Sequence, residues 1–283
     1  MTKIYNSLML KVIDDGLENN FSLQMCPRVN KFEYVIEQIA SQRNMFKNEA
    51  KYCSFLYNMY ITLYINPEPI LLQMLNYEEY PIAKHLGFCG RVYAQSYMGE
   101  TINKFYSSDW KKRANITIQL LNAAFVFTFK HEMFRIYLTD ISMDNIAVSK
   151  SGKVSYIDLE HILLVDKQFE NVFSVSYSKW YNNHTSEIIK CDNKDCFAFS
   201  PTDICSHNLS DHNIYMTCEM LLNESHNYLH GIPKEINERF PNLVDLLHDC
   251  VNPFRANVTK SRFSVSLEIK HMLEESIQIL SST

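Results

Sequence analysis

The chain has 283 residues, 46% of them hydrophobic and 21% charged, which is ordinary usage for a soluble globular protein and excludes disordered and fibrous classes. Lys and Arg total 27 against 32 Asp and Glu, giving a net charge of -5 at pH 7, so nucleic acid is not expected as a partner. The six glycines form neither G-x-G-x-x-G nor G-x-x-x-x-G-K-[ST], which excludes a dinucleotide fold and a phosphate loop.

The first 65 residues follow the three- and four-residue hydrophobic spacing of helices, as in Lys31–Gln42. Two prolines then interrupt the pattern, and a short helix is expected over Ile70–Leu75 because proline suits a first helical turn. The longest apolar stretches, Phe55–Ile65 and Ile116–Phe129, contain Asn or Gln and are shorter than the roughly 20 residues that span a bilayer. We therefore expect core helices there and predict no transmembrane segment.

Beyond residue 80, two strand-like runs, Pro81–Gly90 and Arg91–Met98, predict a hairpin. Ser107-Ser108-Asp109 can cap a long helix that continues to about Lys130. A second hairpin is expected around the turn Lys150-Ser151-Gly152. After an irregular stretch over residues 170–210, three helices are predicted, over Asp211–Leu222, Leu243–Cys250 and Ser264–Leu280.

Five of the eight cysteines crowd the last third of the chain: Cys191, Cys196, Cys205, Cys218 and Cys250. Their gaps differ from the closely spaced pairs of zinc ribbons, so disulfides are expected, with zinc and the nearby His207 and His212 as the alternative. Six N-glycosylation sequons agree with a lumenal glycoprotein, whereas no signal peptide is visible at the N-terminus.

A chemically informative group follows the long helix: Asp140 on a loop, Asn145 where the first hairpin strand starts, and Asp158 just past the second strand. Phosphoryl transfer needs a carboxylate that orients the attacking hydroxyl and oxygen ligands that hold a metal on the phosphates. Asp140 would be the catalytic base, and Asn145 and Asp158 the metal ligands. The alternative is that Asp140 and Asp144 are turn residues and Asn145 caps the hairpin.

This order of a long helix, a D-x-x-x-x-N loop, a hairpin and an Asp resembles the C-terminal lobe of a protein kinase. Upstream, residues 70–100 resemble the stretch of a kinase that leads into its hinge. Downstream, Ser210–Leu222 resembles the kinase helix whose leading Asp, here Asp211, anchors the catalytic loop. Arg262 resembles a further kinase landmark.

More narrowly, the strings NPEP, AKHLGFCGR, DNIAV and CDNKDC followed by DHNIY resemble the divergent protein kinase domain family, in its deleted-in-autism branch. The resemblance covers most of residues 26–280. It implies an α+β, protein-kinase-like fold, with a partial N-lobe and hinge over residues 1–100 and a mostly helical C-lobe with a cysteine-rich insert over residues 101–283. It also implies disulfides, residence in the Golgi lumen or secretion, and use of ATP with Mg²⁺ or Mn²⁺.

The sequence also departs from the kinase pattern. Leu138-Thr139 replaces the His-Arg that precedes the catalytic Asp, Ser142 replaces a Lys, and Asp158-Leu159-Glu160 stands where Asp-Phe-Gly is expected. The chain is expected to begin after the signal or anchor, the phosphate-covering loop and the strand with the ATP-binding Lys.

Two residues are therefore only candidates for the nucleotide site. Lys11 imitates the ATP-binding Lys, with a solvated surface Lys as the alternative. Glu68 lies where a kinase helix supplies the Glu that pairs with this Lys, with a helix-start residue as the alternative.

Three functions stay open from the sequence. The first is a secretory-pathway kinase that transfers phosphate from ATP to a protein or glycan hydroxyl. The second is a weakly active or inactive pseudokinase that acts as a secreted binding or signalling module, with a cell-surface receptor as its partner. The third, a zinc-dependent binding domain, depends only on the Cys and His residues near positions 191–218.

Overall fold

The computed structural model describes residues 23–26, 36–37, 39–40, 49–89, 92–167, 180–187, 199–222, 227–254 and 260–282. These residues divide into two compact units. The first unit holds the described residues within Met1–Tyr97, His131–Asp140 and Tyr156–Phe173. The second holds those within Met98–Lys130, Ile141–Ser155 and Ser174–Thr283.

A three-stranded sheet organises the first unit, in the order β1 (Leu23–Cys26), β8 (Ile162–Asp166), β5 (Phe134–Leu138). The central strand β8 pairs in parallel with β1 and antiparallel with β5. All five residues of β8 are buried, which explains why its first four residues are all apolar. The sequence-based expectation of helix over residues 1–65 is wrong at β1, because pairing with β8 decides the conformation of these four residues.

The other elements of the first unit are the helices α3 (Glu49–Ile65) and α4 (Glu68–Met74) and the hairpin β2 (His85–Cys89) and β3 (Val92–Gln95). The predicted helix over Phe55–Ile65, the short helix after the two prolines and the first hairpin are confirmed. The described residues of the predicted helix at 31–42 are helical, and three of them are buried: Ile36, Ile39 and Ala40.

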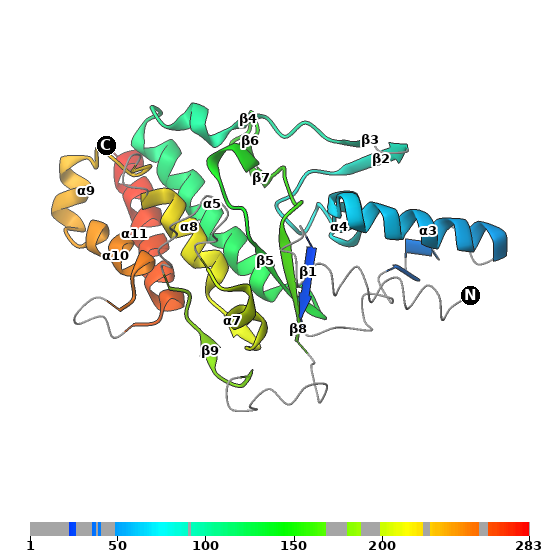
Figure 1. Ribbon diagram of the computed structural model, residues 1–283. Helices are drawn as coiled ribbons and strands as arrows, with labels where there is room; N and C mark the ends of the chain where they lie inside the picture. Colours follow the sequence, from blue (N-terminus) through cyan, green and yellow to red (C-terminus); the bar gives the residue numbers. More distant parts are fainter. Residues whose placement is uncertain are drawn as a thin grey trace, which may run out of the picture. The chain divides into compact units, whose positions relative to one another are not determined.

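Helices dominate the second unit. They are α5 (Trp110–Phe129), α7 (Pro201–Cys205), α8 (His212–Leu222), α9 (Lys234–Arg239), α10 (Leu243–Val251) and α11 (Arg262–Ser282). Figure 1 shows α5, α8, α10 and α11 packed together, and their apolar faces form one buried core. The Asp109 carboxylate accepts a hydrogen bond from the Lys112 backbone N–H at 2.9 Å, so the predicted cap of α5 is confirmed. The three later predicted helices are confirmed as α8, α10 and α11.

Short strands and 3₁₀ turns complete the second unit. β4 (Glu100–Thr101), β6 (Ile146–Val148) and β7 (Val154–Tyr156) form a sheet in that order, and β9 (Asn183–His184) pairs with β10 (Leu209–Ser210). The predicted hairpin of β6 and β7 is confirmed, and Gly152 supplies the positive φ of +84° in its turn. The single turns η2 (Ile102–Phe105) and η3 (Met143–Asn145) flank β4 and β6. None of the described helices of either unit is long and apolar enough to cross a membrane.

Candidate active site

Glu68 is a buried carboxyl group in the first unit, only 2% exposed, at the first position of α4. Pro67 and Pro69 flank it and favour a helix start at this point. Its backbone N–H donates to the Asn66 side-chain oxygen at 2.8 Å. The helix start therefore fixes where the carboxyl group lies, as the helix-start interpretation expects.

The carboxyl group itself has two donors. The Tyr93 hydroxyl of β3 donates to Oε2, and the backbone N–H of Leu159 donates to Oε1 at 3.3 Å. Leu159 directly follows Asp158, so the structure brings Glu68 and the Asp158-Leu159-Glu160 segment together within the first unit. Sequence reasoning named Glu68 and Asp158 separately but missed Tyr93, which only the pairing of β2 with β3 places here.

Burial raises the pKa of Glu68 from 4.5 to about 7, and the negative charges of Asp158 and Glu160 act in the same direction. The hydrogen bonds from Tyr93 and Leu159 lower this pKa but do not outweigh burial. Burial and Glu68 together raise the pKa of the Tyr93 hydroxyl, so it stays a proton donor. In the part of the chain that the structure describes, no Lys or Arg forms an ion pair with Glu68.

The Asp158 carboxylate is half-buried just beyond β7 and accepts a hydrogen bond from the Glu160 backbone N–H at 3.0 Å. Leu159 is 1% exposed and anchors the segment in the core. One residue earlier, the Ile157 carbonyl accepts a hydrogen bond from the Gln95 side chain at 2.9 Å. The segment is therefore fixed on both sides of Asp158, as a metal ligand requires.

Asp140 also belongs to the first unit and lies two residues beyond the end of β5, where it is exposed. The Thr139 backbone N–H donates to the His161 carbonyl at 3.1 Å, which extends the pairing of β5 with β8 to the residue before Asp140. Asn145 belongs to the second unit, at the end of η3, and its backbone N–H donates to the Ser142 carbonyl at 3.2 Å. Each of the three predicted residues thus lies at the end of a regular element.

The donor types of these residues fit a magnesium or manganese ion, because carboxylate and amide oxygens are the ligands that such hard cations prefer. Among the described residues, no group of three or more His, Cys, Asp or Glu side chains is arranged to hold a metal. Substrate phosphates commonly complete magnesium sites that have few protein ligands.

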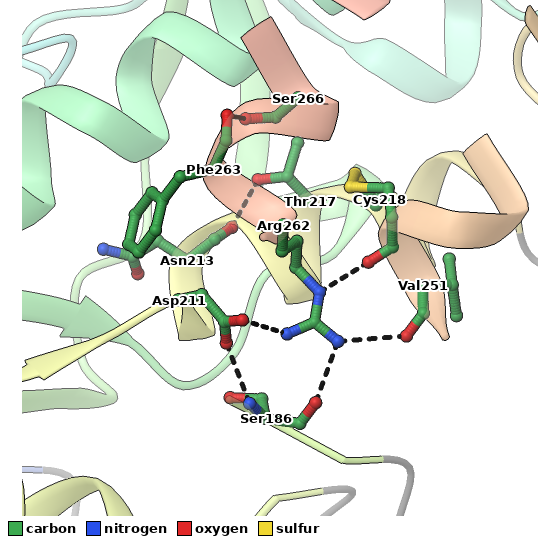
Figure 2. The surroundings of a disulfide bond; sticks show 10 residues. Ser186, Asp211, Asn213, Thr217, Cys218, Val251, Arg262, Phe263 and Ser266 are labelled. Carbon is green, nitrogen blue, oxygen red and sulfur yellow. Dashed lines mark hydrogen bonds and ion pairs between the residues drawn. A yellow bond between two sulfur atoms is a disulfide. The ribbon is translucent and has the colours of Figure 1, made fainter. Parts of the chain in front are cut away.

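Asp211 lies in the second unit, immediately before α8, and is 4% exposed. Arg262 Nη1 and Asp211 Oδ2 are 2.5 Å apart, and the Ser186 backbone N–H donates to Oδ1 at 2.8 Å. Figure 2 shows the Arg262 guanidinium between these two residues and Val251. It also donates to the backbone carbonyls of Cys250, Ser186 and Val251. This buried network, which ties the start of α8 to α10 and α11, is structural.

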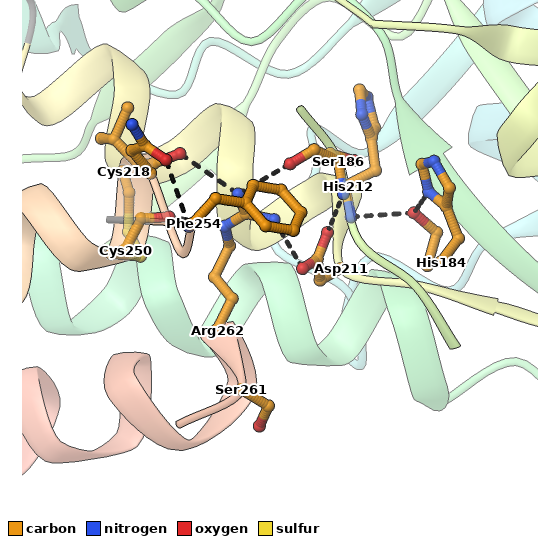
Figure 3. Close-up of polar contacts among 12 residues, drawn as sticks. His184, Ser186, Asp211, His212, Cys218, Cys250, Phe254, Ser261 and Arg262 are labelled. Atoms are coloured by element: carbon orange, nitrogen blue, oxygen red, sulfur yellow. Dashed lines mark hydrogen bonds and ion pairs between the residues drawn. A yellow bond between two sulfur atoms is a disulfide. The ribbon is translucent and has the colours of Figure 1, made fainter. Parts of the chain in front are cut away.

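The network continues to His184, as Figure 3 shows. The His184 Nδ1 and the Ser210 hydroxyl oxygen are 2.8 Å apart, and the same oxygen accepts the His212 backbone N–H at 3.2 Å. Burial, together with the neighbouring His207, lowers the pKa of His184 to about 4. The ring is therefore neutral near pH 7 and acts as part of the scaffold.

The disulfide prediction is confirmed at the three predicted cysteines that the structure describes. Cys218 of α8 and Cys250 of α10 form a disulfide with their Cα atoms 6.0 Å apart, and Cys205 is also disulfide-bonded. Cysteines bonded in this way are not available as zinc thiolates. The predicted structural residues Cys191 and Cys196, and the candidate Lys11, lie outside the described residues.

Comparison with known proteins finds matches over most of the chain. The profile of the protein-kinase domain of FAM69 matches residues 60–253. Divergent protein kinase domain 2A is 34% identical in human and 35% identical in Xenopus tropicalis over 225 residues, which is 76% of this chain and 51% of each relative. Human Divergent protein kinase domain 2B is 24% identical over 226 residues, or 78% of this chain and 48% of that protein. The chain thus spans about half the length of these relatives, and the match confirms the α+β, kinase-like fold.

Proposed function

The chain belongs to the divergent protein kinase family, and on this premise we propose that it is an atypical kinase, which transfers phosphate from ATP to a protein or glycan hydroxyl. The observation that carries the proposal is the contact of Glu68 with the residue after Asp158. Glu68 and Asp158 have separate proposed roles in the same nucleotide site, and this contact brings them close together within the first unit.

The residue roles follow from the chemistry of phosphoryl transfer. Asp140 accepts the proton of the attacking hydroxyl, and its exposure leaves it accessible to a substrate. Asn145 and Asp158 would each offer an oxygen ligand to Mg²⁺ or Mn²⁺, and such an ion would neutralise charge on the phosphates. Glu68 orients a cationic side chain on the phosphates, and Lys11 is the candidate for this cation.

A lumenal or secreted location suits this kinase, because structural disulfides persist in oxidising compartments. The alternative, a pseudokinase that binds a cell-surface receptor, is favoured by Leu138, Thr139 and Ser142, which replace charged kinase residues. It predicts no metal-dependent response to ATP.

The test is a thermal-shift titration of the purified chain with ATP, with and without Mg²⁺ or Mn²⁺. A ligand that binds only the folded state raises the unfolding midpoint, by about 3 °C or more once ATP reaches about tenfold its Kd. We expect a metal-dependent rise that is lost in Asp158→Asn and kept in Asp245→Asn, an exposed Asp of α10 with the same change in charge. Equal responses of both variants, or no response of the folded wild-type chain, contradict the proposal.

A further inference from the structure

A second candidate site is a cavity of about 450 Å³ in the second unit, a volume typical of ligand-binding pockets. Residues 141–144, which directly follow Asp140 in the chain, form one wall. Asn103 of η2 and the adjacent Tyr106 form a second wall, and Glu219 and Met220 of α8 form a third. None of the residue roles proposed above uses this cavity.

Two carboxyl groups line the cavity, Asp144 from the loop and Glu219 from α8. The Asp144 carboxylate accepts a hydrogen bond from the Asn103 side chain, which fixes its position on the wall. Glu219 is half-buried and has no hydrogen-bonding or cationic partner among the residues that the structure describes. Burial raises the pKa of Glu219, and no positive charge among the described residues opposes this rise. A cationic group in the cavity would therefore stabilise the ionised form of Glu219.

Apolar side chains also line the cavity, from Ile141, Met143 and Met220, beside the polar Asn103, Tyr106 and Ser142. This combination suits the side chain of arginine or lysine, whose long aliphatic stem packs on apolar surface while its charged head pairs with carboxylates. It suits a metal ion poorly, because no group of three or more metal-binding side chains exists among the described residues. The net charge of -5 further favours a basic ligand.

We propose that this cavity binds an arginine or lysine side chain of a polypeptide substrate, so that the chain selects serine or threonine hydroxyls in basic sequences. The selection of a phosphorylation site rests on the proposed function, whereas binding of the basic side chain does not. In this proposal the Glu219 carboxylate pairs with the charged head of the basic side chain, and the Asp144 carboxylate accepts a second hydrogen bond from it. Met143 and Met220 contact its aliphatic stem.

The test measures fluorescence anisotropy of a fluorescein-labelled serine peptide with two arginines, titrated with the full chain in the absence of nucleotide. We expect Glu219→Gln to weaken binding about 10-fold, since a hydrogen bond to a charged group contributes about that factor. Replacing the arginines by uncharged citrulline should weaken binding of the wild-type chain by a similar factor. The citrulline peptide should not distinguish the wild-type chain from Glu219→Gln.

The matched control is Glu235→Gln, which removes the same charge from an exposed position in α9 outside the cavity. Equal loss of peptide binding in Glu219→Gln and Glu235→Gln, or no binding of the arginine peptide by the wild-type chain, overturns the proposal. Glu219→Gln is nearly isosteric and removes an unpaired half-buried charge, so its unfolding midpoint should not fall. If that variant fails to fold, Asp144→Asn provides the same test, with a smaller expected loss.

The nucleotide titration separates this proposal from the proposed function. Glu219-dependent peptide binding without any metal-dependent response to ATP would reject the kinase and keep the basic-side-chain site. A response to ATP with peptide binding that is independent of Glu219 would keep the kinase and reject the site.

Discussion

At the residue scale, the buried Glu68 makes the stability of the first unit depend on pH. Because the folded-state pKa of Glu68 is about 7 and the unfolded value is 4.5, the folded state binds more protons between these values. The stabilising contribution of the protonated form is complete below about pH 4.5 and is lost as the pH rises to about 7. The difference amounts to about 3 kcal/mol at most.

We therefore predict that Glu68→Gln removes part of the fall in stability between pH 5 and pH 8. The neutral amide keeps an oxygen that can accept from Tyr93 or Leu159 but cannot ionise. The unfolding midpoint of the variant at pH 8 should be several degrees above that of the wild-type chain, and the two should converge at pH 5. Glu78→Gln, at an exposed position of the first unit, is the control and should follow the wild-type curve. Parallel curves for Glu68→Gln and the wild-type chain would show that Glu68 is ionised throughout.

At the element scale, Gly99 illustrates a position where the backbone leaves no room for a side chain. A Cβ atom on Gly99 would lie 2.1 Å from the Val148 carbonyl oxygen of β6, and the φ of Gly99 is +113°. Both the overlap with backbone and the positive φ oppose any other residue. The pairing of β4 with β6, next to the loop that carries Asn145, depends on this close approach.

We predict that Gly99→Ala lowers the free energy of unfolding by about 3 kcal/mol or more, measured by urea denaturation. Gly152→Ala is the matched control, because Gly152 has a φ of +84° but no atom within 4 Å of its added Cβ. Its cost should be only the backbone strain of about 1–2 kcal/mol. Similar losses for both variants would mean that the β4–β6 ladder adjusts without cost.

The elements also show where sequence patterns were sufficient. α5 combines a capping Asp with a long helical spacing, and β6 and β7 flank a strong turn, so local signals defined these elements. β5 and β8 gave no alternating pattern, because β8 is buried throughout and its run of apolar residues fits a strand or a helix equally. Only their mutual pairing decides that they are strands.

At the scale of the whole molecule, the disulfide between Cys218 and Cys250 closes a loop with a sequence separation of 32 residues. A loop of this size restricts the unfolded chain by about 3–4 kcal/mol. The disulfide joins α8 to α10, and the backbone carbonyl of Cys250 accepts a hydrogen bond from the buried Arg262. Loss of the disulfide would therefore also loosen the hydrogen-bond network of Arg262 and Asp211.

We predict that the double variant Cys218→Ala/Cys250→Ala lowers the free energy of unfolding by about 3–4 kcal/mol under oxidising conditions. Cys89→Ala is the control, because Cys89 is exposed and has a free thiol, and it should change the stability little. Mass spectrometry without reduction should find Cys218 joined to Cys250. Free thiols at these two positions in the folded chain would contradict the disulfide.

The sequence by itself determined the family, the kinase-like fold class and most helices of the second unit, because these depend on local spacing and on strings of residues. It also singled out Asp140, Asn145 and Asp158 as candidate site residues. Only the tertiary structure decided that Glu68 is buried against Leu159, that Tyr93 donates to Glu68, and that Glu219 has no cationic partner within the described part of the chain. Such features depend on desolvation and on contacts between residues far apart in the chain. A sequence pattern cannot predict these features, because a Glu at an exposed helix start would have the same local sequence as Glu68 but an ordinary pKa.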